Sequence, residues 1–213
     1  MSNLPDPIDR RLVTPLLNNL YWVHRDIVAA IANAIPRRPD EDLPWLAAQL
    51  SREVSEIPRY KGRLDAIGFT PTEDIRIRDS LVRYRELRQT DSAIALAVGM
   101  NVVAQGTLGI IEPEYLHVYF GDFLDFFPEA IAAMREDLDT AVEFLGRQPP
   151  EAVMAELTRL WHHLHRITIP ELAPLLEPII ARGIFPRTLV AESIDRFLQI
   201  AARLGVPRDA FAH

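Results

Sequence analysis

The chain has 213 residues, a net charge of −7, no cysteine and an apolar content of 48%. Because no block of lysines and arginines offers phosphate a basic face, we expect no nucleic-acid partner. The lack of cysteine excludes disulfides, thiolate catalysis and cysteine-ligated metal centres. The opening residues carry no apolar segment of the secretory type, so the sequence predicts a cytoplasmic protein.

The sequence predicts one all-α domain. Neither a low-complexity run nor a Gly/Ser linker divides residues 1–213, and no stretch alternates apolar and polar residues over strand length. We therefore predict an antiparallel helical bundle, with a four-helix core over 8–146 and additional helices over 151–205.

Two long amphipathic helices are predicted at the start. Apolar residues recur every three or four positions over 8–35, and again from Pro44 to Ile67, where Gly68 ends the pattern. A bend is expected just after Glu53, at Pro58. A short helix crowded with arginine is predicted over 75–87.

The segment 92–111 carries no charge, although 25% of the chain is charged. A helix that is apolar all round lies in the middle of a fold, and its glycines indicate close contacts with neighbouring helices. Asn101 and Gln105 are four residues apart and share a face, so their amides need buried partners. These polar groups, and the lack of a second such segment, argue against a membrane span. Glu112-Pro113-Glu114 is predicted to end this helix.

The second half of the chain predicts further helices. A fourth runs over 116–145 with a bend at Pro128, and a fifth runs over 151–165. Prolines every fourth residue predict that 170–180 is kinked or broken, and a last amphipathic helix follows over 190–204.

Glu53 is the leading candidate site residue, because it occupies an apolar position in the stripe of the second helix. A buried carboxylate is paired, metal-bound or protonated with a raised pKa. One interpretation is a structural ion pair with Arg25 or Arg52, or an approach to solvent at the bend. The other is a functional acid or base.

Histidines offer weaker candidates. His24 lies near the inner face of the first helix, where packing is the commoner role for a lone histidine. His162, His163 and His165 suggest metal ligands by spacing, but no acidic partner accompanies them in sequence. An acidic row along the fourth helix is typical of a solvated face; it comprises Asp122, Asp125, Glu129, Glu136, Asp139 and Glu143.

The helix order over 8–146 resembles the ferritin-like diiron-carboxylate superfamily. Its members carry Glu-x-x-His on the second and fourth helices and a glutamate on the first and third, which together bridge two metal ions. The corresponding positions here are Glu53-Val54-Ser55-Glu56, Glu136-Asp137-Leu138-Asp139, Gln105, and His24 or Asp26. With both histidines and one carboxylate replaced, the resemblance implies the fold without a standard diiron site.

The sequence thus predicts a pocket for a small organic molecule, with Glu53 as acid or base, lined by His24, Tyr60, Asn101 and Gln105. The leading hypothesis is an enzyme of small-molecule metabolism that uses no standard metal site; the pattern names no cofactor and leaves homo-oligomerisation open. Two alternatives remain. One is an atypical iron- or manganese-dependent oxidase or oxygenase. The other is a non-catalytic module that binds through an arginine-rich surface formed by Arg76, Arg78, Arg83, Arg85 and Arg88.

Overall fold

The computed structural model describes residues 4–72, 86, 90 and 92–211. Over these residues the fold is all-α, with no strand. The predicted helix over 75–87 and the arginine-rich surface (Arg76, Arg78, Arg83, Arg85 and Arg88) lie outside the described residues. The ferritin-like arrangement stays a prediction.

The first two helices form a long antiparallel pair. Helix α1 spans Pro7–Ala34, and its first turn is capped by Asp6, whose carboxylate accepts the backbone N–H groups of Ile8 and Asp9. Two short 3₁₀ turns, Ile35–Arg37 and Asp40–Asp42, lead into α2, which spans Leu43–Ala66. Both predicted helices are confirmed, and Pro58 lies inside α2 without ending it.

The apolar segment is the central helix, and it is longer than the sequence predicts. It consists of α4 (Ala93–Leu96), a π-helical stretch η4 (Ala97–Gly109) and α5 (Ile110–Phe120). The prediction that residues 112–114 end this helix is wrong. Thr107 has non-helical backbone angles, which mark a kink, and α5 begins three residues later with Pro113 inside it. The chain turns at Gly121 instead, with φ of 48°.

Glycine permits the π-helical backbone of η4. A Cβ atom at Gly109 would lie 2.2 Å from the carbonyl oxygen of Ala104, five residues earlier. One at Gly106 would lie 2.8 Å from the carbonyl oxygen of Asn101 and 2.9 Å from Cδ1 of Ile200. The predicted contact with neighbouring helices is therefore confirmed at Gly106, which also approaches Leu138, whereas Gly109 is crowded by the backbone of its own segment.

The remaining helices complete the fold. After a 3₁₀ turn at Gly121–Leu124, α6 spans Phe127–Gly146, so the fourth helix begins at 127 rather than 116. Helix α7 (Pro150–His163) continues through a π-helical turn (Leu164–Thr168) into α8 (Ile169–Ala181). Helix α9 (Leu189–Arg203) and a 3₁₀ turn (Arg208–Phe211) close the described chain.

The segment 170–180, which was predicted to be kinked or broken, is a continuous part of α8, so the predicted break is wrong. Pro174 and Pro178 lie inside α8 and face solvent, while Leu172, Leu175, Leu176 and Ile179 are buried. The cost of each proline, about 3 kcal/mol, is offset by burial of the apolar side chains between them.

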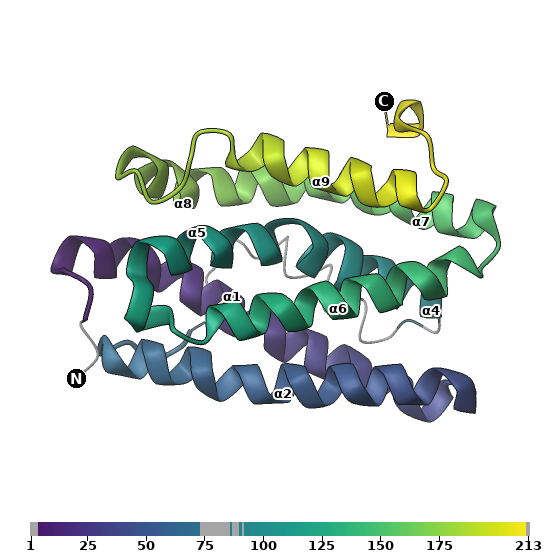
Figure 1. Ribbon diagram of the computed structural model, residues 1–213, viewed down its shortest axis with the longest axis horizontal. Coiled ribbons are helices and arrows are strands. Elements are labelled where there is room, and N and C mark those ends of the chain that lie inside the picture. Colours follow the sequence, from purple (N-terminus) through teal and green to yellow (C-terminus); the bar gives the residue numbers. More distant parts are fainter. Residues whose placement is uncertain (1–3, 73–85, 87–89, 91, 212–213) are drawn as a thin grey trace.

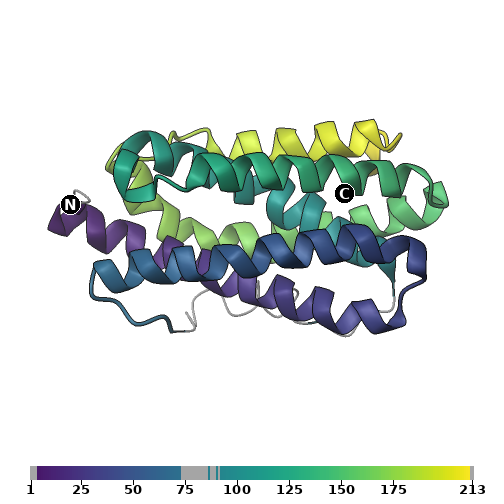
Figure 2. The same ribbon diagram turned by 60° about the horizontal axis from the view of Figure 1, so that its bottom comes forward.

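The helices stack in layers (Figure 1), with α1 and α2 on one side, the central helix and α6 in the middle, and α7, α8 and α9 on the other. Figure 2 shows α2 running between α1 and α6, both of which it contacts. The stretch Ala93–Leu124 has the length and composition of a membrane span, and 78% of its most apolar window is buried inside the fold. Its described surroundings are therefore other helices of the same chain.

Candidate functional site

Four buried polar side chains from three helical segments form one hydrogen-bonded chain. Nδ2 of Asn101 donates to Oε1 of Gln105 at 2.9 Å, and Nε2 of Gln105 donates to Oε1 of Glu53 at 2.6 Å. The other carboxylate oxygen, Oε2 of Glu53, lies 2.5 Å from Nδ1 of His24. The amide chain of η4 thus ends on a carboxylate–histidine pair that joins α2 to α1.

Local sequence explains this arrangement. Glu53 occupies an inward position of α2, and His24 faces it from α1, the helix against which α2 packs. The amide of Asn101 donates to that of Gln105, which donates to one oxygen of Glu53, while Oδ1 of Asn101 has no partner among the described residues. These four predicted site residues are therefore brought together.

Tyr60, the fifth predicted site residue, is fully buried two turns after Glu53 on the same face of α2. Its ring centroid lies 4.8 Å from that of His24. Its hydroxyl makes no hydrogen bond to any residue that the structure describes. Burial, and the negative charges of nearby glutamates, raise the pKa of Tyr60 well above 10.0, so its hydroxyl stays protonated.

The charge partner of Glu53 is a histidine, not an arginine. Arg52 pairs with Asp137, and Arg25 donates to the Tyr21 hydroxyl. For His24, burial opposes the charged form, but the charge of Glu53 and its hydrogen bond outweigh burial and raise the pKa of the imidazole. The contact with Glu53 therefore favours the charged form of His24.

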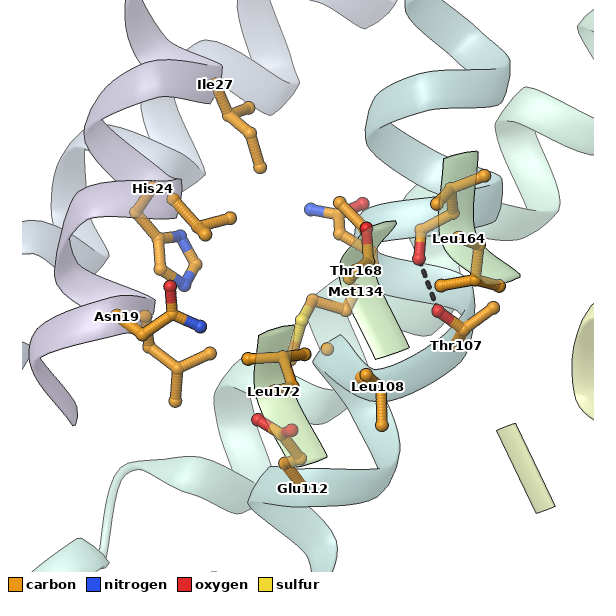
Figure 3. Close-up of a pocket in the computed structure, with 16 residues that line it drawn as sticks. Asn19, His24, Ile27, Thr107, Leu108, Glu112, Met134, Leu164, Thr168 and Leu172 are labelled. Atoms are coloured by element: carbon orange, nitrogen blue, oxygen red, sulfur yellow. Dashed lines mark hydrogen bonds between the residues drawn. The ribbon is translucent and has the colours of Figure 1, made fainter. Parts of the chain in front are cut away.

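Two cavities adjoin this pair. The first, of about 60 Å³, lies between α1, the end of η4, α6 and α8, and it is lined mainly by apolar side chains with His24, Gln105, Asn19, Thr107, Thr168 and Glu112. Figure 3 shows His24, Asn19 and Ile27 on the α1 side and Thr107, Leu108 and Glu112 on the facing segment. We call it the apolar cavity.

The second cavity, of about 100 Å³, lies on the α2 and α6 side and is polar. It is lined by His24, Arg52, Glu53, Ser55, Glu56, Gln105, Glu129, Ala130, Ala133, Met134 and Asp137. We call it the polar cavity. His24 and Gln105 line both cavities, whereas Asn101 and Tyr60 are among the lining residues of neither. The structure therefore places those two behind the cavity walls.

Glu112 is a buried acid that the sequence interpretation missed. It lines the apolar cavity and makes no hydrogen bond or ion pair with the described residues. Burial alone raises the pKa of its carboxyl group to about 8, so it is protonated at neutral pH. Glu112 lies in Glu112-Pro113-Glu114, a pattern that is typical of a helix end and so does not mark a buried acid.

Other buried polar groups were also missed. Gln49 lies one turn before Glu53 on the same face of α2, and its amide makes no hydrogen bond to the part of the chain described. Burial raises the pKa of Glu56, which lines the polar cavity. Asp137, the partner of Arg52, is buried although Glu136 before it is exposed. The spacing of 49, 53, 56 and 60 along one helix face could have revealed the α2 residues.

The described residues contain no group of three or more histidine, aspartate or glutamate side chains placed to hold a metal ion. Within the cluster of His162, His163 and His165, the ring of His165 packs in a tilted orientation against that of Trp161, with 3.9 Å between the ring centroids. Burial and the nearby His162 lower the pKa of His165. The predicted acidic row of α6 (Glu129, Glu136, Asp139 and Glu143) is exposed, as expected of a solvated face.

Comparison with protein-family models, with curated proteins and with solved structures found no match. Function is therefore argued from the site alone.

Proposed function

We propose that this protein binds a small organic molecule in the apolar cavity and that the Glu53–His24 pair transfers a proton to or from it. The observation that carries this proposal is the 2.5 Å contact between two buried titratable groups, the imidazole of His24 and the carboxyl group of Glu53, of which His24 lines the cavity. A carboxylate that orients a histidine is a common arrangement in proton-transfer catalysis.

The roles of the residues follow from their contacts. Glu53 makes a hydrogen bond with Nδ1 of the imidazole. Nε2 is therefore the ring nitrogen that remains to exchange a proton with a ligand. Gln105 fixes the second carboxylate oxygen, and Asn101 fixes the amide of Gln105. This refines the sequence hypothesis, because Glu53 positions and charges the histidine while His24 makes the ligand contact.

The ferritin-like interpretation draws support from the same place. The polar cavity is lined from α1, α2, η4 and α6 by His24, Glu53, Gln105 and Met134. These are the four segments from which the resemblance expects inward-facing site residues. We keep this as part of the proposal.

The test uses a library of small organic molecules with weakly acidic C–H groups, screened by ligand-observed NMR. Ala104 lines the apolar cavity, so Ala104→Leu fills it and should weaken every genuine hit at least tenfold. At a pH above the raised pKa of His24, where the imidazole is neutral and can accept a proton, the parent should accelerate exchange of the ligand's acidic C–H for deuterium in D₂O.

His24→Asn keeps a polar group in place but cannot accept a proton, so exchange should slow by roughly 100-fold or more while binding persists. Ligands whose affinity is unchanged by Ala104→Leu would overturn the proposal. A C–H exchange rate that is unchanged by His24→Asn would do the same.

A further inference from the structure

The apolar cavity holds an acid without a counter-charge. The titratable side chains that line it are His24 and Glu112, and His24 is already balanced by Glu53. No lysine or arginine is among the lining residues. Glu112 is therefore the one group in this cavity whose charged form lacks a partner within the described structure.

Thr107 lines the same cavity as Glu112 and offers a hydrogen-bond acceptor. The hydroxyl proton of Thr107 is given to the backbone carbonyl of Val103, which leaves the hydroxyl oxygen as an acceptor. Figure 3 shows Thr107 and Glu112 on the same side of the cavity, facing α1. An ionised Glu112 and the Thr107 oxygen together present acceptors to a ligand.

The size and lining of the cavity limit how large the ligand can be and favour an apolar remainder. A volume of about 60 Å³ equals roughly two water molecules, or three to four non-hydrogen atoms. Leu20, Val23, Val103, Leu108 and Leu172 supply apolar contact for a short hydrocarbon part. Half-buried residues at its edge, among them Asn19, Leu108 and Thr168, bring the cavity near the surface.

We propose that the apolar cavity binds a short-chain aliphatic amine, with its ammonium group on the carboxylate of Glu112 and its alkyl part against the apolar wall. This rests on the proposed function, since it names the ligand class of the same cavity. The positive charge of the ligand supplies what the unpaired carboxylate lacks, and its N–H groups meet the acceptors.

Binding in this way releases a proton. Glu112 is protonated in the free protein at neutral pH, so an ammonium ion that binds its carboxylate displaces that proton to the buffer. Affinity should therefore rise roughly 50-fold from pH 6 to pH 8. The other titratable groups facing this region are His24 on α1 and Tyr60 on α2. Tyr60 keeps its proton throughout this range.

The experiment compares n-propylamine with 1-propanol, which has the same shape without the charge. Binding is measured by ligand-observed NMR and by calorimetry in two buffers of different ionisation enthalpy, using the parent, Glu112→Gln and the exposed control Glu136→Gln. We expect n-propylamine to bind the parent at least tenfold more tightly than 1-propanol, with release of close to one proton at pH 7. In Glu112→Gln the amine preference, the proton release and the rise in affinity should all disappear, while 1-propanol binding and the folded state persist.

The outcomes separate the two proposals. If 1-propanol binds but the amine binds no better, or if Glu112→Gln leaves the preference intact, the amine inference is overturned and the cavity remains a ligand site. If neither probe nor any library member binds in a manner sensitive to Ala104→Leu, the proposed function fails as well. Thr107→Val provides a second variant, and it should weaken the amine several-fold without removing proton release.

Discussion

Glu53 and Glu112 are equally buried, each 3% exposed, yet their surroundings differ completely. Glu53 has a partner on each oxygen, the amide of Gln105 on one and the ring of His24 on the other. Glu112 has no partner among the described residues, and burial raises the pKa of its carboxyl group to about 8. Burial therefore does not by itself decide the state of a carboxyl group, because partners that stabilise the charged form can outweigh desolvation.

The largest expected effect is at the paired acid. Glu53→Gln leaves His24 without its counter-charge, and loss of one partner of a buried pair costs about 3–5 kcal/mol. The pKa of His24 is raised in the folded state from its ordinary 6.5, so the stabilisation is fully present below pH 6.5 and is lost as pH rises through the folded-state pKa. Urea unfolding at pH 6 and pH 9 should show the greater loss at pH 6. An equal loss at both values would contradict the ion pair.

The unpaired acid should respond in the opposite direction. The pKa of Glu112 rises from 4.5 to about 8 on folding, so the folded state binds more protons and loses stability as pH rises between these values. Glu112→Gln removes that penalty and should stabilise the protein by on the order of 3 kcal/mol at pH 8.5, with little gain near pH 4.5. Thermal unfolding across this range measures it, and a gain independent of pH would argue against an ionising group.

The close packing of η4 can be tested by substitutions of its glycines. Gly109→Ala places a Cβ against a main-chain carbonyl and Gly106→Leu overfills a contact with Ile200, so each should cost about 1–3 kcal/mol or more. Gly62→Ala in α2 is the matched control. Nothing lies within 4 Å of its added atom, and it should stabilise α2 by about 0.5–1 kcal/mol. Equal unfolding midpoints for all three variants would contradict the close packing of η4.

The smallest effect on stability is expected at exposed carboxylates. Glu136→Ala and Asp139→Ala on α6 should change the free energy of unfolding by less than about 0.5 kcal/mol, even though Asp139 contacts Arg203. Chemical denaturation at pH 7 checks this. A loss above 1 kcal/mol would mean that this acidic row is not a simple solvated face.

Helical periodicity predicted much of the fold, because amphipathic helices such as α1, α2 and α9 record their buried faces in their apolar spacing. It failed where burial overrode a local breaker. Pro113 follows a kink, and Pro174 and Pro178 lie on the solvent side of a helix held by buried leucines. Which turn ends a helix depends on tertiary contacts that spacing does not contain.

The site was predictable where a polar residue interrupted an apolar pattern. Glu53, Asn101 and Gln105 stood out for that reason, but their pairing with His24 required the approach of α1 to α2. Glu112 was overlooked because an acid before a proline is a common helix end, and only the cavity around it reveals its isolation. Partner identity is a property of three-dimensional neighbours, which a single sequence does not list.

The position of His24 between two cavities has a kinetic consequence. One compartment is apolar and sized for a ligand, while the other is lined by the exposed Ser55 and Glu129 and meets solvent. A ligand and a solvent proton can therefore reach the same imidazole–carboxylate unit from opposite directions. An occupied ligand chamber would not seal the histidine from water, so its protonation state could be reset while the ligand stays bound, and repeated proton exchange would not have to wait for ligand release.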